Sequence, residues 1–162
     1  MSETAEQIVA LMGLEPHAEG GFFRETYRAP ETVQTAAGPR SLCTAILFLV
    51  TATKPSRFHR LKSDELWLHQ GGDPLEIVTL PQADADGAVG TLGPTGRGEP
   101  QVLVPAGLWQ AARVAVTEDG AGWSLAACIV TPGFDYADFE LAERQALLAG
   151  WPDLGDLIRA LT

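Results

Sequence analysis

Residues 56–77 read SRFHRLKSDELWLHQGGDPLEI, and the fold can be inferred outward from this stretch. In both SRFHRL and DELWLHQ, side chains of different polarity alternate, and the residues between them suit a turn. A Gly-Gly-Asp-Pro run then ends the second segment. Alternation with a period of two is typical of β-strands. The stretch therefore predicts two strands joined by a tight turn.

Alternate side chains of a strand share a face, so the pattern also predicts which residues lie together. His59 shares its face with Arg57 and Leu61, and Glu65 shares its face with Trp67 and His69. If both faces point inward, a hairpin would bring His59 and Glu65 together. His69 lies four residues beyond Glu65, roughly 13 Å along a strand, so we expect it in the wall of a pocket rather than beside Glu65.

The rest of the chain continues the same pattern, with helices only at its ends. Short β-rich segments separated by Gly, Pro, Asp or Lys include GGFFRETYR, SLCTAILFLVT, PLEIVTL, PQVLVP, LWQAARVAV and WSLAACIVT. This succession predicts an all-β sandwich or barrel. Helical spacing predicts a helix over Ser2–Met12 that buries Ile8, Leu11 and Met12, one over Phe139–Ala149 capped by Asp138, and a short one from Pro152.

Length and composition limit the classes of protein to consider. The 162 residues are expected to form one domain, residues 1–162. A net charge of −10 argues against a nucleic-acid partner. The acidic N-terminus is no signal peptide, and no apolar run is long enough to span a membrane. Cys43 and Cys128 lie in apolar runs without metal-ligand spacing, so we expect both to be buried and reduced in a cytoplasmic protein.

The stretch around His59 resembles the first motif of the cupins, G-x5-H-x-H-x3,4-E-x6-G. His59 matches the first His of this motif, Glu65 matches its Glu, and Gly72 matches its closing Gly. Leu61 stands where the motif has its second His. Half of the motif's histidines are therefore missing from this chain.

A second cupin motif, G-x5-P-x-G-x2-H-x3-N, is matched in part about forty residues further on. Pro105 and Gly107 match, whereas Gln110 stands in place of the His and Val114 in place of the Asn. Segments such as EPHAEGGFFRETYRA, RFHRLKSDELW and TPGFDYADFELA narrow the resemblance to the cupin type-5 subfamily of unknown function. This resemblance implies a jelly-roll β-barrel with a core at about residues 14–152, a pocket inside the barrel, and a homodimer.

The resemblance also bears on a metal. A typical cupin centre holds a divalent transition metal through three His and one Glu. Here His59, Glu65 and Gln110 could offer only one imidazole, one carboxylate and one amide, and transition metals prefer more imidazole than that. No cofactor is firmly implied, and at most a weakly bound divalent metal is expected.

Two functions are compatible with these residues. In the first, His59 and Glu65 are catalytic and act as acid and base on a small polar, sugar- or nucleotide-like ligand, in the manner of the cupin-fold sugar-nucleotide epimerases, which pair a His with a Tyr. Ligand contacts would come from Arg57, Trp67, His69, Gln110 and Tyr136. In the second, the chain is a non-catalytic module that binds or senses a small ligand at a degenerate metal site.

Several placements stay open at the level of sequence. His59 and Glu65 could simply satisfy each other in the core, and His17 could be a loop residue or a pocket residue. Only one of Arg24 and Glu25 can face the interior. The basic residues Lys54, Arg57, Arg60 and Lys62 form either a solvated surface or an anchor for a small anion.

Overall fold

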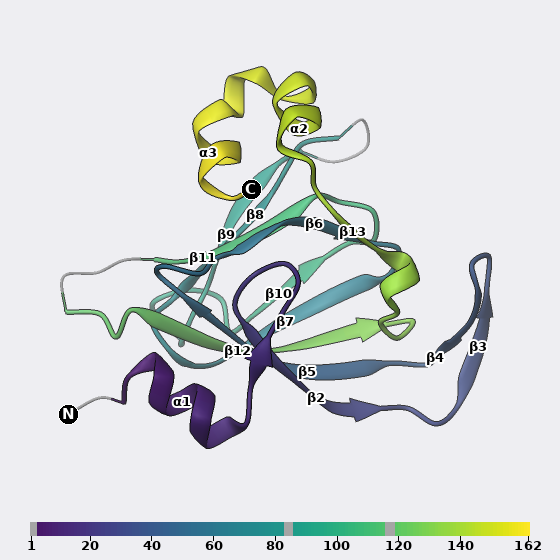
Figure 1. The fold of residues 1–162 in the computed structure, drawn as a ribbon, viewed down its shortest axis with the longest axis horizontal. Helices are drawn as coiled ribbons and strands as arrows, with labels where there is room; N and C mark the ends of the chain where they lie inside the picture. The colour runs from purple at the N-terminus through teal and green to yellow at the C-terminus, as the bar shows by residue number, and fades with distance from the viewer. Residues whose placement is uncertain (1–2, 83–85, 116–118) are drawn as a thin grey trace.

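Two antiparallel sheets face each other in the computed structural model, which describes residues 3–82, 86–115 and 119–162 (Figure 1). The six-stranded sheet has the order β1 (Glu15–Pro16), β2 (Phe22–Arg28), β5 (Thr44–Thr51), β12 (Trp123–Thr131), β7 (Asp64–Gly72), β10 (Gln101–Val104). The five-stranded sheet has the order β13 (Phe139–Leu141), β6 (Ser56–Leu61), β11 (Gln110–Val114), β8 (Leu75–Thr79), β9 (Ala88–Leu92). The fold is a mainly β sandwich with short terminal helices, as the sequence predicted.

A separate hairpin extends from one side of the sandwich. It consists of β3 (Thr32–Thr35) and β4 (Gly38–Ser41), and Figure 1 shows it projecting beyond the ends of β2 and β5. The short 3-10 helix η1 (Tyr136–Asp138) lies between β12 and β13. The hairpin and this helix contact each other through side chains that are described below.

Short helices close the two ends of the chain. The first, α1 (Ala5–Met12), begins at a capping box formed by Thr4 and Gln7 and ends at Gly13, whose φ of 61° suits glycine. Ile8 is buried as predicted and Met12 is partly buried, but Leu11 is 70% exposed. The predicted first residue, Ser2, lies outside the described residues.

The C-terminal helices pack on the outer face of the five-stranded sheet (Figure 1). They are α2 (Arg144–Gly150), η2 (Pro152–Leu154) and α3 (Gly155–Ala160), and they bury Leu147 and Ile158 against Phe58 and Trp109. The predicted helix over Phe139–Ala149 was too long, because its first residues form β13 beside β6. Asp138 does not cap α2. It belongs to η1, and its carboxylate forms ion pairs with the side chains of Arg40 and Lys62 instead.

The main core lies between the two sheets. Its largest members are Phe48, Trp67, Leu75, Ile77 and Leu92, all at most 2% exposed. Cys128 is buried in this core and Cys43 is only half-buried; neither forms a disulfide. No described helix is both long enough and apolar enough to cross a membrane.

The predicted β6–β7 hairpin was wrong, and the difference changes the geometry of the site. β6 pairs with β11 and β13, whereas β7 pairs with β10 and β12 in the other sheet. The turn between them therefore carries the chain from one sheet to the other. His59 and Glu65 face each other across the interior of the sandwich rather than along one hairpin.

A substitution at Gly72 would test how tightly β7 packs on β12. Its φ is 79°, and a Cβ atom there would collide with the backbone oxygen and ring of Trp123. We expect Gly72→Ala to lower the free energy of unfolding by about 2–4 kcal/mol, since strain and overlap act together. Urea unfolding measures this. Gly150→Ala is the control, because its Cβ would meet no atom within 4 Å; an equal loss in both variants would contradict this account.

Candidate functional site

A cavity of about 310 Å³ lies between the sheets. Its lining combines an apolar wall with several titratable side chains, drawn from both sheets and from the segments before β2 and after β12. The lining residues are His17, Glu19, Phe23, Glu25, Arg28, Thr44, Ile46, Phe48, His59, Leu61, Glu65, Trp67, Cys128, Val130, Phe134, Asp135 and Tyr136. The cavity thus contains both His59 and Glu65.

The imidazole of His59 has a fixed orientation. Its Nδ1 lies 2.8 Å from the carbonyl oxygen of Arg57, which can only accept, so Nδ1 carries a proton and donates it. The ring of Phe139 stacks on the imidazole with centroids 5.6 Å apart. In a neutral His59, Nε2 is then the bare nitrogen. It lies 3.5 Å from Oε2 of Glu19.

Glu19 is the residue that the sequence did not indicate. It is 6% exposed, its Oε1 accepts a 2.6 Å hydrogen bond from the Ser56 hydroxyl, and its Oε2 also lies 3.3 Å from Nδ1 of His17. Burial acts to raise the pKa of Glu19, but the attraction of His59 and the contacts with His17 and Ser56 outweigh it, so the pKa falls below its ordinary value. Glu19 is therefore a buried carboxylate between two imidazoles.

His17 lies against several aromatic rings at this end of the cavity. Its ring meets Phe23 edge-on at 4.6 Å between centroids and stacks on Tyr136 at 6.2 Å. Its Nδ1 is also 3.3 Å from the backbone N–H of Glu19, which donates to it in the neutral ring. Of the two placements left open by the sequence, the structure has His17 in the pocket.

Glu65 lies on β7 of the six-stranded sheet, opposite the five-stranded sheet that carries His59. It is 5% exposed, and its Oε2 accepts a 2.6 Å hydrogen bond from Nε2 of Gln110. Burial raises the pKa of Glu65 from 4.5 to about 7, an effect that His59 reduces and Glu19 increases. Glu65 therefore changes its protonation near neutral pH, while Glu19 stays ionised.

Gln110 positions Glu65 and does not reach the cavity. Its amide oxygen accepts a 3.2 Å hydrogen bond from the indole N–H of Trp67, and its amide nitrogen donates to Glu65. The side chain is buried and is absent from the cavity lining. The oxygen and the nitrogen of this amide are thus both engaged. Gln110 does not face a ligand or a metal, as the sequence had suggested it would.

The other predicted contact residues divide into two groups. Trp67 and Tyr136 line the cavity, whereas Arg57 and His69 do not. The guanidinium of Arg57 donates to the backbone oxygens of Ala18 and Glu19, so it holds the loop before β2 against β6. Nε2 of His69 is buried without a hydrogen-bond partner among the described residues.

The basic residues around β6 do not converge on an anion site. Lys54 lies over the ring of Phe22, Arg60 lies over Trp109 and pairs with Glu140, and Lys62 pairs with Asp138. The structure therefore spreads the predicted cluster over separate partners. It also answers the question left open for β2, because Glu25 lines the cavity and Arg24 does not.

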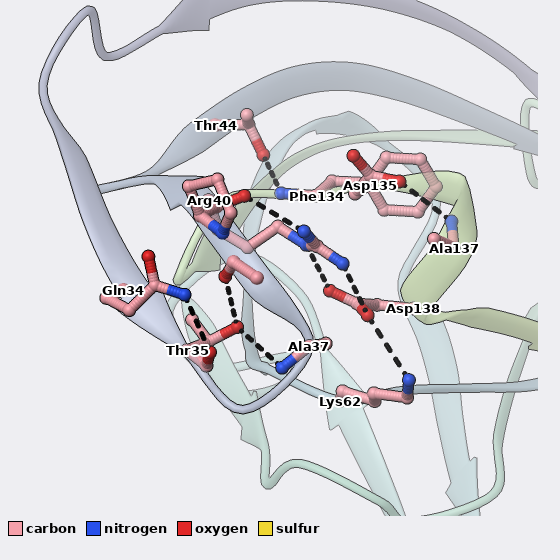
Figure 2. Close-up of polar contacts among 12 residues, drawn as sticks. Gln34, Thr35, Ala37, Arg40, Thr44, Lys62, Phe134, Asp135, Ala137 and Asp138 are labelled. Atoms are coloured by element: carbon pink, nitrogen blue, oxygen red, sulfur yellow. Dashed lines mark hydrogen bonds and ion pairs between the residues drawn. The ribbon is translucent and has the colours of Figure 1, made fainter.

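The rim of the cavity is the segment of residues 134–138, and a polar network holds it in place (Figure 2). The guanidinium of Arg40, on the projecting hairpin, donates to both carboxylate oxygens of Asp138 at 2.6 and 3.0 Å, and Lys62 lies 3.4 Å from the same carboxylate. The hydroxyl of Thr44 accepts from the backbone N–H of Phe134 at 2.9 Å. These contacts fix the segment that carries Phe134 and Tyr136 over the cavity.

A family model described as "Cupin superfamily (DUF985)" matches residues 6–142, most of the chain. The chain belongs to this family of the cupins. An uncharacterized protein of Saccharomyces cerevisiae is 27% identical over 146 residues, which is 82% of this chain and 72% of that protein.

Solved structures support the same assignment. A hypothetical protein from Leishmania major is 34% identical with a TM-score of 0.89 and coverage of 99% of both chains. A protein of Shewanella oneidensis is 33% identical with a TM-score of 0.87, covering 99% of this chain and 98% of that one. Oxalate decarboxylase of Bacillus subtilis, at 12% identity and a TM-score of 0.56 over 92% of this chain and 37% of that one, shares the fold.

The side chains of this cupin do not fit the metal centre typical of the superfamily. Leu61 has no donor atom, and the amide oxygen of Gln110 accepts from Trp67. Within the part of the chain that the structure describes, no three or more His, Cys, Asp or Glu side chains are grouped so as to hold a metal ion. The groups of this site that can take part in chemistry are therefore its titratable side chains.

Replacing Glu65 with Gln should change how stability depends on pH. Below pH 4.5 the folded and unfolded chains both keep the Glu65 proton; between there and pH 7 only the folded chain keeps it, so stability falls as pH rises. Relative to the native protein, Glu65→Gln should gain up to about 3 kcal/mol between pH 5 and pH 8. Urea unfolding at both pH values measures this, and a difference that does not vary with pH would contradict it.

Asp138→Asn should loosen the rim without unfolding the sandwich, because it removes the charge that Arg40 and Lys62 bind. We expect the amides of residues 134–139 to exchange with solvent roughly tenfold faster, as read by hydrogen–deuterium exchange. Glu140→Gln, which removes only the exposed pair with Arg60, is the control. Unchanged exchange in Asp138→Asn would show that the backbone contacts suffice.

Proposed function

We propose that this cupin binds a small polar molecule in the cavity and moves protons on it, as an isomerase or epimerase does. The observation that carries the proposal is the pair His59 and Glu65, which approach one cavity from opposite sheets, with the pKa of Glu65 raised to about 7. A group that titrates near the working pH suits acid–base catalysis, because both of its protonation states are populated.

His59 supplies one of the two proton-transfer groups. Since Nδ1 donates to the Arg57 carbonyl, any proton exchanged with a ligand passes through Nε2. Oε2 of Glu19, 3.5 Å away, stabilises the imidazolium that forms when Nε2 carries a proton. The protonated His59 can then give this proton to a carbonyl oxygen of the ligand.

Glu65 supplies the other group. As a carboxylate it can take a proton from the carbon next to that carbonyl while His59 gives one to the oxygen, so that an enol forms and no net charge is created on the ligand. Return of the two protons by the reverse transfers regenerates the carbonyl with its original configuration. Inversion at the carbon requires the enol to turn over in the cavity, so that Glu65 delivers the proton to the opposite face. The hydrogen bond from Gln110 holds the Glu65 carboxylate in position for this exchange.

The size and walls of the cavity limit the ligand. A volume of about 310 Å³ is at the lower end of the range of ligand pockets, roughly 300–1,000 Å³. It suits a single sugar-like ring rather than a whole nucleotide. Trp67 and Tyr136 offer ring surfaces that pack against such a ligand.

A second function is favoured by the same departures from the cupin motifs. Gln110 fixes Glu65 through a bond that would persist with or without a reaction, and Leu61 gives the wall an apolar surface. A module that only binds or senses a small ligand needs nothing more.

Homodimer formation and a cytoplasmic location stay predictions of the sequence.

Deuterium exchange into a ligand separates the two functions. The protein is incubated in D₂O with a panel of monosaccharides, amino sugars and small hydroxyketones, and proton NMR follows the hydrogen next to each carbonyl. Catalysed loss of that signal is expected for at least one compound, with His59→Ala reducing the rate at least about a hundredfold while affinity stays within about tenfold.

Tyr27→Phe is the matched control, because Tyr27 is exposed and does not line the cavity; it should leave the exchange rate unchanged. A compound that binds the native protein but exchanges no hydrogen would favour the binding module. Exchange that survives in His59→Ala would remove His59 from the mechanism.

A further inference from the structure

The charges that line the cavity define the kind of ligand that it can accept. The acidic members are Glu19, Glu25, Glu65 and Asp135, and the basic members are Arg28, His17 and His59. With both imidazoles protonated and Glu65 neutral, the lining has no net charge. Whenever Glu65 is ionised or an imidazole is neutral, the lining is negative. An anionic ligand therefore gains nothing from the overall charge of the cavity.

The one arginine of the lining is already occupied. Arg28 donates to both carboxylate oxygens of Glu25, at 3.1 and 2.7 Å, and its remaining terminal nitrogen donates to the carbonyl oxygen of Phe134 at 3.2 Å. No other Arg or Lys among the described residues lines the cavity. The contacts with Glu25 and Phe134 use three of the five N–H groups of Arg28, and the charge of Glu25 already offsets that of the guanidinium. A phosphate or carboxylate would therefore meet an arginine that is already paired with a carboxylate.

The carboxylate of Glu65, in contrast, forms no ion pair with a cationic side chain of the described residues, because His59 pairs with Glu19 instead. Among the described residues, the side-chain hydrogen bond to its carboxylate comes from the uncharged amide of Gln110, which donates to Oε2. Glu65 is only 5% exposed and still lines the cavity. A cation placed in the cavity would give this carboxylate the partner that the protein does not provide.

The apolar part of the lining is also suited to a cation. Five aromatic residues line the cavity: Phe48 and Trp67 belong to the core, Phe23 packs against that core, and Phe134 and Tyr136 lie in the segment after β12. The faces of aromatic rings attract organic cations, most strongly where water is excluded. Aromatic walls together with an unpaired carboxylate are thus complementary to an alkylammonium group.

We propose that the natural ligand of this cavity is a small organic cation, an amine in its ammonium form, whose charge lies against Glu65. The proposal names the ligand class of the proposed acid–base site and rests on the assignment of the cavity as that site. It replaces the anion that the basic residues near β6 had suggested. An amino-substituted sugar or hydroxyketone would meet both requirements.

Three probes with the same branched alkyl group test the charge preference: isobutylamine, isobutanol and isovalerate, which are cationic, neutral and anionic at pH 8. Ligand-observed NMR titration gives a dissociation constant for each. We expect isobutylamine to bind at least about tenfold tighter than isobutanol and isovalerate to bind most weakly, since each tenfold step corresponds to about 1.4 kcal/mol.

Two variants locate the effect. In Glu65→Gln the amine should fall to within about threefold of the alcohol, because the charge that distinguishes them is gone while the shape is kept. Glu140→Gln, an exposed carboxylate outside the cavity, should leave the tenfold preference intact. A preference that persists in Glu65→Gln would overturn the placement of the ammonium group.

Other outcomes overturn the proposal as a whole. They are equal binding of amine and alcohol, tighter binding of isovalerate, and binding of none of the three probes. None of these results depends on turnover, so they are distinct from a failure of the deuterium-exchange experiment. A protein that prefers the amine but exchanges no hydrogen would retain the ligand class and lose the catalytic role.

Discussion

One buried amide connects the two sheets at the site. Gln110 belongs to β11 of the five-stranded sheet, and it binds Trp67 and Glu65, which both belong to β7 of the six-stranded sheet. All three side chains are nearly inaccessible to solvent, so each polar atom in this chain of bonds would be costly to leave without a partner. The bridge fixes the separation of the sheets at this point. It also presents Glu65 to the cavity with one oxygen engaged, which keeps the buried carboxylate in place without neutralising it.

The sequence was sufficient for the longer strands of the sandwich and for the faces of β6 and β7, but not for β1, β3, β4, β9 and β13. The period of two places His59 with Leu61 and Glu65 with Trp67, and all four line the cavity. The same rule could not give the pairing of strands, because a short turn can close a hairpin or carry the chain to another sheet. It also could not show how far a side chain reaches. Arg57 is on the strand of His59, yet its long side chain turns to the loop before β2.

Glu19 was missed because it is held by the tertiary structure and belongs to no strand. The loop that carries it docks on the start of β6, where the backbone N–H of Arg57 donates to the Glu19 carbonyl at 2.9 Å and Ser56 donates to its carboxylate. One signal was present in the sequence: the Gly-Gly pair that follows Glu19. Gly20 has a φ of 113°, and a Cβ atom there would overlap the backbone of Pro55. Such a pair indicates a close approach of two backbones, and an acidic residue beside it is then a candidate for the interior.

The substitutions at the two motif positions change what kind of chemistry the cavity supports. A metal centre requires several donors that converge on one point with their lone pairs free. Here the donor at position 110 uses its oxygen for Trp67 and its nitrogen for Glu65, so it constrains a carboxylate where a histidine would bind an ion. Because it is buried, that carboxyl group holds its proton up to about pH 7, and across the cavity His59 is paired with Glu19, a carboxylate that stays ionised. The cupin sandwich therefore brings an oriented imidazole and a carboxyl group that titrates near neutral pH to one cavity. The negative balance of charge around them follows from the same residues, and it links the ability to transfer protons to a preference for a positively charged ligand.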